Sequence, residues 1–140
     1  MPTEEMMLYD YLGDYGIVDG KYTLFHISLR KNLDSILRWG IKAPRGPEEQ
    51  TFDKFDPARG VYMIAEEIHV PTFLDEYLSH DNLKPDDIVL FRVRLPIVWP
   101  VRPDPSSLIM EEVPTAFISD IAIPASALEI VDMSEYGVQT

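Results

Sequence analysis

The chain has 140 residues, of which 46% are hydrophobic and 26% charged, with a formal net charge of −12. This length and composition predict one soluble globular domain over residues 1–140. The sequence contains no cysteine, which excludes disulfides, thiolate nucleophiles and cysteine-bound zinc. The acidity opposes direct binding to nucleic-acid backbones, and it mainly predicts good solubility.

The N-terminal segment over residues 1–20 is expected to be a short extension of the domain. It is acidic and lacks the basic start and long apolar stretch of a secretory signal, so we expect a cytoplasmic protein. No apolar run reaches the roughly 20 residues that would cross a bilayer, which predicts no membrane segment. Met7 and Tyr11 recur at helical spacing and predict a short docking helix.

The first strand is predicted over Tyr22 to Ile27, a stretch rich in aromatic and β-branched residues, with His26 near its end. An amphipathic helix is expected to follow, capped by Ser28 and ended by Gly40. Its apolar stripe comprises Leu29, Leu33, Ile36 and Leu37.

Residues 43–59 hold three prolines and show no sustained hydrophobic periodicity, which predicts a long functional loop. The phenylalanines in this segment favour an ordered lid.

The segment GVYMIA over residues 60–65 predicts a second, buried strand. Pro71 then opens a helix whose apolar stripe comprises Phe73, Leu74, Tyr77 and Leu78. The segment DIVLFRVRL over residues 87–95 alternates strictly, as expected for a strand in an antiparallel or mixed sheet. AFISDIAIP and ALEIV predict late strands around a turn. Together these elements predict an α+β fold with segregated helices.

Considered alone, His26 is expected to be a core or edge histidine bonded to neighbouring backbone. No metal is expected, because His69 and His80 are too far apart for a ligand pair on one helix face. Ser28 and Ser119 lack the sequence context of an activated nucleophile, which argues against a hydrolase triad.

The order of these features resembles the ADP-ribosyltransferase fold, in its histidine–tyrosine–glutamate branch, over residues 22–131. This branch includes the diphtheria-toxin-like enzymes and the poly-ADP-ribose polymerases. The resemblance rests on a first strand ending in His26-Ile27-Ser28, a helix, a proline-rich loop and a second strand with a Gly-Val-Tyr sequence. It implies mixed or antiparallel sheets with a few segregated helices around an NAD cleft.

The resemblance also implies roles for individual residues. His26 and Ser28 would bind ribose, and main-chain groups of the first strand, at Ile27, would read the nicotinamide amide. Tyr62 and Phe73 would sandwich the nicotinamide ring, since aromatic faces favour a flat cation. The loop over residues 43–59 would close over NAD. The residues expected to bind NAD are His26, Ile27, Ser28, Arg59, Gly60, Tyr62 and Phe73.

The chain departs from the family pattern at the late strand. There, active transferases carry a glutamate that stabilises the oxocarbenium-like transition state, whereas this sequence has Ala116. A small shift of the preceding loop would bring Glu112, in preference to Glu111, into that place. The residues expected to be catalytic are therefore Glu112, His26 and Tyr62.

The expected function is an NAD-dependent mono-ADP-ribosyltransferase with a protein or nucleic-acid acceptor and no metal. The first alternative is a catalytically degenerate module of the same fold that binds a nucleotide or a protein partner. The second is an acidic inhibitor of a basic partner, in keeping with the net charge of −12. The third is an enzyme similar to RNA 2′-phosphotransferases, which also lack the glutamate but grip phosphates with several basic residues.

Overall fold

The longest strand pair of the computed structural model is β2 (Lys21–Leu29) with β4 (Ile88–Pro96). It runs antiparallel over nine residue pairs, from Lys21↔Pro96 to Leu29↔Ile88. The structure describes residues 6–14, 16–41, 61–80, 82–103 and 116–137. The other described strands are β1 (Met6–Met7), β3 (Val61–Ile64), β5 (Pro100–Pro103), β6 (Ala116–Ser119) and β7 (Leu128–Val131).

These strands form one seven-stranded sheet in the order β1-β5-β6-β3-β2-β4-β7, and each described pairing is antiparallel. The α-helices of the described residues are α1 (Leu8–Leu12), α2 (Leu33–Trp39) and α3 (Val70–His80). Single 3₁₀ turns lie at Arg30–Asn32, Glu67–His69, Pro85–Asp87, Ala125–Ala127 and Met133–Tyr136. The predicted α+β class is therefore confirmed.

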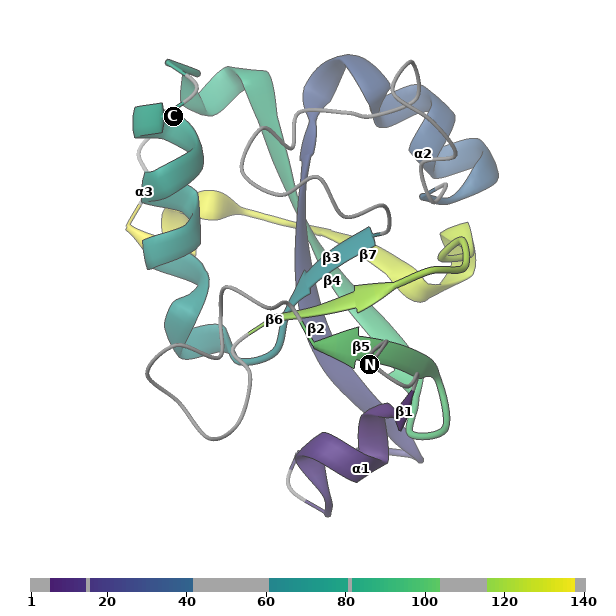
Figure 1. The fold of residues 1–140 in the computed structure, drawn as a ribbon. Coiled ribbons are helices and arrows are strands. Elements are labelled where there is room, and N and C mark those ends of the chain that lie inside the picture. The colour runs from purple at the N-terminus through teal and green to yellow at the C-terminus, as the bar shows by residue number, and fades with distance from the viewer. Residues whose placement is uncertain (1–5, 15, 42–60, 81, 104–115, 138–140) are drawn as a thin grey trace, which may run out of the picture.

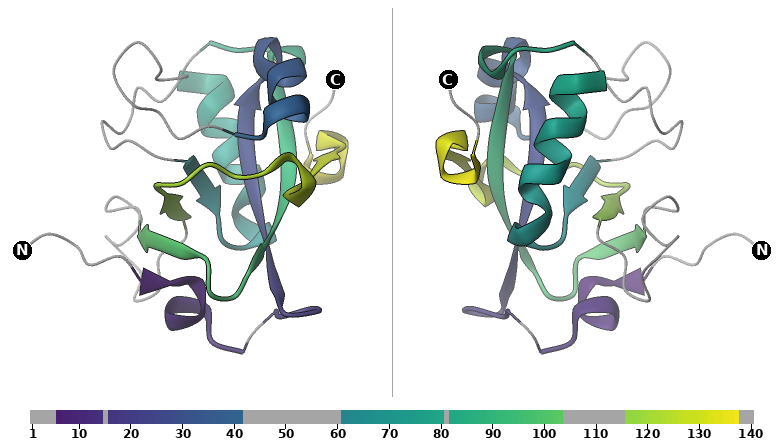
Figure 2. Two further views of the ribbon diagram at one scale, coloured as in Figure 1. Left: turned by 90° about the vertical axis from the view of Figure 1, so that its right-hand side faces the viewer. Right: turned by 90° about the vertical axis from the view of Figure 1, so that its left-hand side faces the viewer.

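The two long helices cover opposite faces of the sheet. Figure 1 shows α3 on one side of the β2–β4 pair and α2 on the other, and the two views in Figure 2 place each helix in turn in front of that pair. Alternation along the strands supplies an apolar residue to each face. In β4, Phe91 packs in the core beneath α2, whereas Leu90 packs in the core beneath α3.

The alternation predicted for β4 is confirmed by these two cores. The α2-side core contains Val89, Phe91, Val93 and Leu95, together with Leu24, Met63 and Ile36 from β2, β3 and α2. The α3-side core contains Ile88 and Leu90, together with Phe25, Ile27, Ile64, Val70 and Leu74. The predicted stripe of α3 is also confirmed, because Leu74 is fully buried and Phe73, Tyr77 and Leu78 pack beside it.

The prediction that Ser28 caps a helix is wrong. Strand β2 continues to Leu29, because its pairing with β4 extends that far, and α2 begins only at Leu33 after a 3₁₀ turn. Leu37 is consequently 51% exposed, although it was expected on the apolar stripe. The predicted end of the helix is confirmed, since the Gly40 N–H donates to the Ile36 carbonyl at 2.8 Å.

The described N-terminal residues belong to the packed structure. Strand β1 pairs with β5, and Leu8 at the start of α1 is fully buried. The ring of Tyr11 lies 5.0 Å from that of Phe117, between ring centroids. The predicted helix is thus present but spans only Leu8–Leu12. Among the described residues, no helix is both long and apolar enough to cross a membrane.

Candidate functional site

The sheet opens between β2 and β3. Their described register comprises a single pair, Phe25↔Ile64, in contrast to the nine pairs that join β2 to β4. Just beyond this pair, the His26 side chain bridges the two strands: its Nδ1 atom lies 2.6 Å from the Tyr62 carbonyl oxygen. The histidine therefore replaces a main-chain contact at the point where the strands separate.

The protonation of His26 follows from this contact and from burial. Burial lowers the pKa of His26 to about 4, although the bond to the Tyr62 carbonyl acts in the opposite direction. The imidazole is therefore neutral at pH 7. Because a carbonyl only accepts, Nδ1 carries the single proton and donates it. Nε2 is then an unprotonated acceptor, and no described residue hydrogen-bonds to it.

Ser28 follows His26 on the same face of β2, since side chains two positions apart in a strand share a face. The residue is only 6% exposed, and its side chain has no hydrogen-bond partner among the described residues. The hydroxyl and the His26 acceptor therefore form a short polar stretch on the face of β2 that also carries Leu24.

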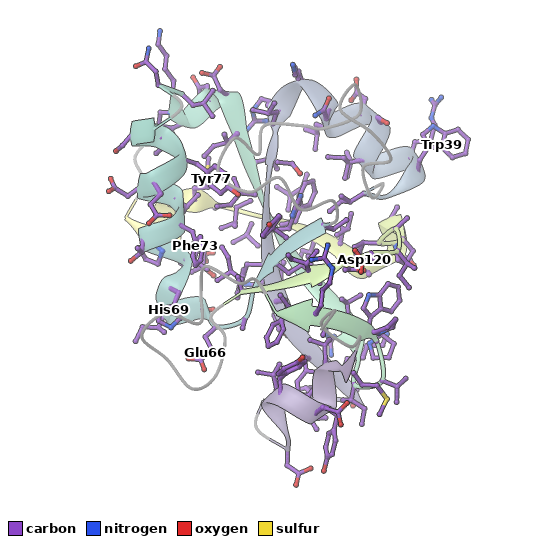
Figure 3. All side chains as sticks on the ribbon, in the orientation of Figure 1. Trp39, Glu66, His69, Phe73, Tyr77 and Asp120 are labelled. Carbon is purple, nitrogen blue, oxygen red and sulfur yellow. The ribbon has the colours of Figure 1, made fainter. Side chains whose placement is uncertain are left out.

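Tyr62 and Phe73 lie on the other side of the sheet. Val61 and Met63 pack in the α2-side core, so alternation directs the intervening Tyr62 to the α3 side. Phe73 packs against the α3-side core, and Figure 3 shows it on the side of α3 that faces the sheet. The structure thus brings the two predicted ring residues to one face. His26 is directed to the other face and contacts Tyr62 through the main chain.

Three predicted site residues, Arg59, Gly60 and Glu112, lie outside the described residues. Ala116, at the position where the family carries a glutamate, is the first residue of β6 and is buried opposite Ile64 of β3. The described part of the late strand therefore presents no carboxylate at its start.

Ser119 has a structural role. It is fully buried, accepts from the Trp99 indole Nε1 at 3.0 Å and donates to the Ile121 carbonyl at 2.7 Å. A hydroxyl whose hydrogen is committed to a carbonyl is not poised as a nucleophile. Within the described ranges there is also no group of three or more His, Cys, Asp or Glu residues that could hold a metal ion.

Two pockets were not predicted from the sequence. One, of about 650 Å³, is bordered by Lys21, Arg92 and Arg94. The other, of about 760 Å³, lies beside the start of α3 and is bordered by Glu66, Glu67 and Glu135.

The sequence contains only part of the signal for the first pocket. Strict alternation in LFRVRL predicts that Arg92 and Arg94 share one face of the strand. Their meeting with Lys21 depends on the pairing of β2 with β4, which the sequence pattern does not give.

Comparison with family models finds no match for this chain. Comparisons with curated proteins and with solved structures also find none. The geometry of the site therefore has to carry any assignment of function.

Proposed function

We propose that the protein is a cytoplasmic NAD-dependent mono-ADP-ribosyltransferase of the ADP-ribosyltransferase-like fold, acting on a protein or nucleic-acid acceptor. The observation that carries the proposal is the state of His26 at the opening between β2 and β3. Its Nδ1 proton is committed to the Tyr62 carbonyl, which leaves Nε2 as a fixed acceptor. A neutral acceptor of this kind suits a sugar hydroxyl, which can donate to it.

Ser28 adds a second polar group for the sugar. Two positions along a strand span about 7 Å, so His26 and Ser28 can contact one ribose and the group attached to it. The Ser28 hydroxyl has no hydrogen-bond partner among the described residues, so it is available to a ligand. Both groups therefore favour a ligand rich in hydroxyls.

The nicotinamide ring would be held by Tyr62 and Phe73, which lie on the α3 side of the sheet, whereas His26 and Ser28 lie on the α2 side. A single NAD would therefore have to pass between β2 and β3, beyond their Phe25↔Ile64 pair, for its ribose and its ring to reach both sets. Beyond the Phe25↔Ile64 pair, the main chain of β2 around Ile27 has no described ladder partner in β3. Main-chain groups at such an edge can bond the carboxamide of the ring. Arg59 and Gly60 precede β3 in the sequence and would complete the NAD-binding set.

In the proposed reaction, the bond between nicotinamide and ribose C1′ breaks, and nicotinamide leaves with the bonding electron pair. The acceptor nucleophile then forms a bond to C1′ and loses its proton to water. Positive charge develops on the sugar as the first bond breaks, and the Glu112 carboxylate would stabilise it electrostatically. His26 and Tyr62 would orient the sugar and the leaving ring.

Incubation with NAD labelled in its ADP-ribose part, in the presence of lysate proteins and of nucleic acids, tests this function. Transfer of label is expected, with loss of transfer in Glu112→Gln and retention in the matched control Glu111→Gln. Absence of both transfer and NAD hydrolysis across these acceptors contradicts the proposal.

A binding module without catalysis is the second candidate, and the buried Ala116 at the start of β6 favours it. Calorimetry with NAD and ADP-ribose separates the two functions. Binding without turnover supports the module, whereas any turnover that depends on Glu112 excludes it.

A further inference from the structure

A basic pocket lies at the edge of the sheet where β4 extends beyond β7. Strand β7 pairs with β4 only from Leu90 to Val93, so β4 continues past the end of β7 through Arg94. The pocket has a volume of about 650 Å³. Its lining includes Lys21, Thr23, Arg92, Arg94, Trp99 and Ser126.

The charge of this pocket is opposite to that of the chain. Three cationic side chains border it, whereas the described part of its lining contains one carboxylate, Glu129. The whole chain has a net charge of −12. Glu129 forms an ion pair with Arg92. No described carboxylate pairs with Lys21 or Arg94. Within the described ranges, Lys21 and Arg94 are therefore two cations without a carboxylate partner, and two such cations bind a phosphate better than one would.

The positions of these cations follow from the strand register. Thr23 of β2 lies opposite Arg94 of β4, and Lys21 lies two positions further along the same face of β2. The Arg94 guanidinium donates to the Val18 carbonyl at 3.2 Å, which holds the side chain beside the pocket. A pre-positioned guanidinium loses less conformational entropy when it binds a phosphate.

Trp99 lines the same pocket. Its indole N–H is bonded to the buried Ser119 hydroxyl at 3.0 Å, so the ring is fixed in orientation. The hydroxyl-bearing residues Thr23 and Ser126 also line the pocket. An aromatic side chain, hydroxyl-bearing residues and two cations without a described carboxylate partner match the base, the sugar and the phosphate of a nucleotide, because every base has a face that stacks on an aromatic ring.

We propose that this pocket binds a nucleoside phosphate, either a free nucleotide or the phosphorylated end of a single strand. The acidity of the remaining chain disfavours contacts along an extended phosphate backbone, so recognition is confined to one nucleotide. The proposal is independent of NAD chemistry at His26, because His26 bonds toward β3 whereas this pocket lies toward β4 and β7.

The test uses Trp99 fluorescence. The chain has two tryptophans. Trp39, at the end of α2, projects outward (Figure 3), and it is 66% exposed. In the Trp39→Phe background, Trp99 is therefore the only tryptophan reporter. AMP is titrated beside adenosine, inorganic phosphate and a short 5′-phosphorylated single-stranded oligonucleotide. We expect a saturable change with AMP and affinity at least about tenfold weaker for adenosine, which lacks the charged contacts.

Charge variants locate the site. The double variant Lys21→Gln/Arg94→Gln should weaken AMP binding at least about tenfold. The control double variant Lys31→Gln/Lys84→Gln removes equal charge elsewhere and should change AMP affinity by less than about twofold. Lys21→Arg with Arg94→Lys keeps both charges and should retain most of the affinity. Circular dichroism shows whether each variant is folded.

The outcomes separate this proposal from the proposed function. A Trp99 response that persists in His26→Ala supports an independent site, even if no ADP-ribosyl transfer is found. Loss of the response in His26→Ala, with retention in the Lys21/Arg94 variant, assigns the nucleotide to the other site and overturns the proposal.

The comparison of ligands is the second test. Equal affinity for adenosine and AMP, or for inorganic phosphate and AMP, also overturns the proposal. Tighter binding of the oligonucleotide than of AMP identifies a nucleic-acid end as the ligand, and the reverse identifies a free nucleotide.

Discussion

The Nδ1 atom of His26 lies 2.6 Å from the main-chain oxygen of Tyr62, a residue on the neighbouring strand. This contact joins β2 to β3 immediately beyond their one described register pair, Phe25↔Ile64. A structural role and a ligand-binding role of His26 are therefore compatible, because they use different ring nitrogens. Nδ1 bonds the protein, and Nε2 remains for a ligand.

The two roles of His26 can be separated by substitution. His26→Ala should destabilise the fold by about 1–3 kcal/mol, because the hydrogen bond from His26 to the Tyr62 carbonyl is lost. His26→Asn places an amide N–H close to the position of Nδ1 but offers no group at the position of Nε2. It should retain most of the stability yet weaken NAD binding by about tenfold. Denaturant unfolding and calorimetry on both variants measure these effects, and unchanged stability of His26→Ala would contradict the structural role.

Stability should depend on pH through His26. Its pKa is lowered by burial from its ordinary value of 6.5 to about 4, so between these values the unfolded chain binds more protons than the folded one. Stability from this group is therefore complete above about pH 6.5 and is lost as the pH falls toward 4, by up to about 3 kcal/mol.

Urea unfolding at several pH values measures this dependence, with His26→Asn as the control. The asparagine variant should show a shallower loss of stability over the same range, because it lacks the titrating group. Identical slopes for the two proteins would show that His26 titrates normally in the folded state.

Gly40 ends α2 at a position that requires glycine. Its φ is +84°, and a Cβ built there would lie 2.1 Å from the carbonyl oxygen of Ile123. That carbonyl accepts from the Ile41 N–H at 2.8 Å, so a methyl group would also disrupt this bridge. Gly40→Ala should cost about 2–4 kcal/mol of unfolding free energy, from backbone strain and the lost contact.

Gly20→Ala is the matched control for this steric effect. Gly20 also has a positive φ, of +73°, but nothing lies within 4 Å of the added Cβ. Backbone strain alone should cost about 1–2 kcal/mol there. Equal destabilisation by the two substitutions in thermal unfolding would contradict the close approach of Gly40 to Ile123.

Ser119→Ala should destabilise the protein by about 1–3 kcal/mol, because the Trp99 indole N–H and the Ile121 carbonyl both lose their partner. Ser79→Ala, on the exposed surface of α3, should change stability by less than about 0.5 kcal/mol. Chemical unfolding of both variants provides the comparison. A neutral Ser119→Ala would show that the buried hydroxyl is dispensable.

The local sequence pattern predicted the helices and strands more fully than it predicted the contacts between them. Period-two alternation identified β4 and its two faces, and the apolar stripe with Pro71 identified α3, because these signals are contained in neighbouring residues. Ser28 was misassigned as a helix cap because its strand partner, Val89, lies 61 residues away along the chain. A serine hydroxyl alone is compatible with both a helix N-cap and a strand.

The site was predicted only in part for the same reason. His26, Tyr62 and Phe73 were selected as residues, but which sheet face each occupies depends on the register of β2 with β3. The bond between His26 and Tyr62 crosses 36 positions of sequence. Similarly, Lys21 and Arg94 meet only because β2 pairs with β4 from Lys21↔Pro96 onward.

Phe73 provides the last prediction, since its ring is assigned to nicotinamide in the proposed function. It is only partly buried on the sheet-facing side of α3 (Figure 3), whereas its neighbour Leu74 is fully buried. Phe73→Leu keeps an apolar side chain of similar size and should change stability by less than about 1.5 kcal/mol. Loss of the ring face should weaken NAD binding about three- to tenfold, while Phe73→Tyr keeps that face and should retain affinity.

Tyr77→Leu is the control for Phe73→Leu, because Tyr77 lies one turn further along the same side of α3 and loses the same kind of ring. Its NAD affinity should stay within about twofold of the unsubstituted protein, since the proposed ring site does not include it. Calorimetry with NAD, corrected for the folded fraction from unfolding curves, gives both affinities. If Phe73→Leu and Tyr77→Leu weaken NAD equally, or if neither does, Phe73 serves packing alone and the nicotinamide ring must be held elsewhere.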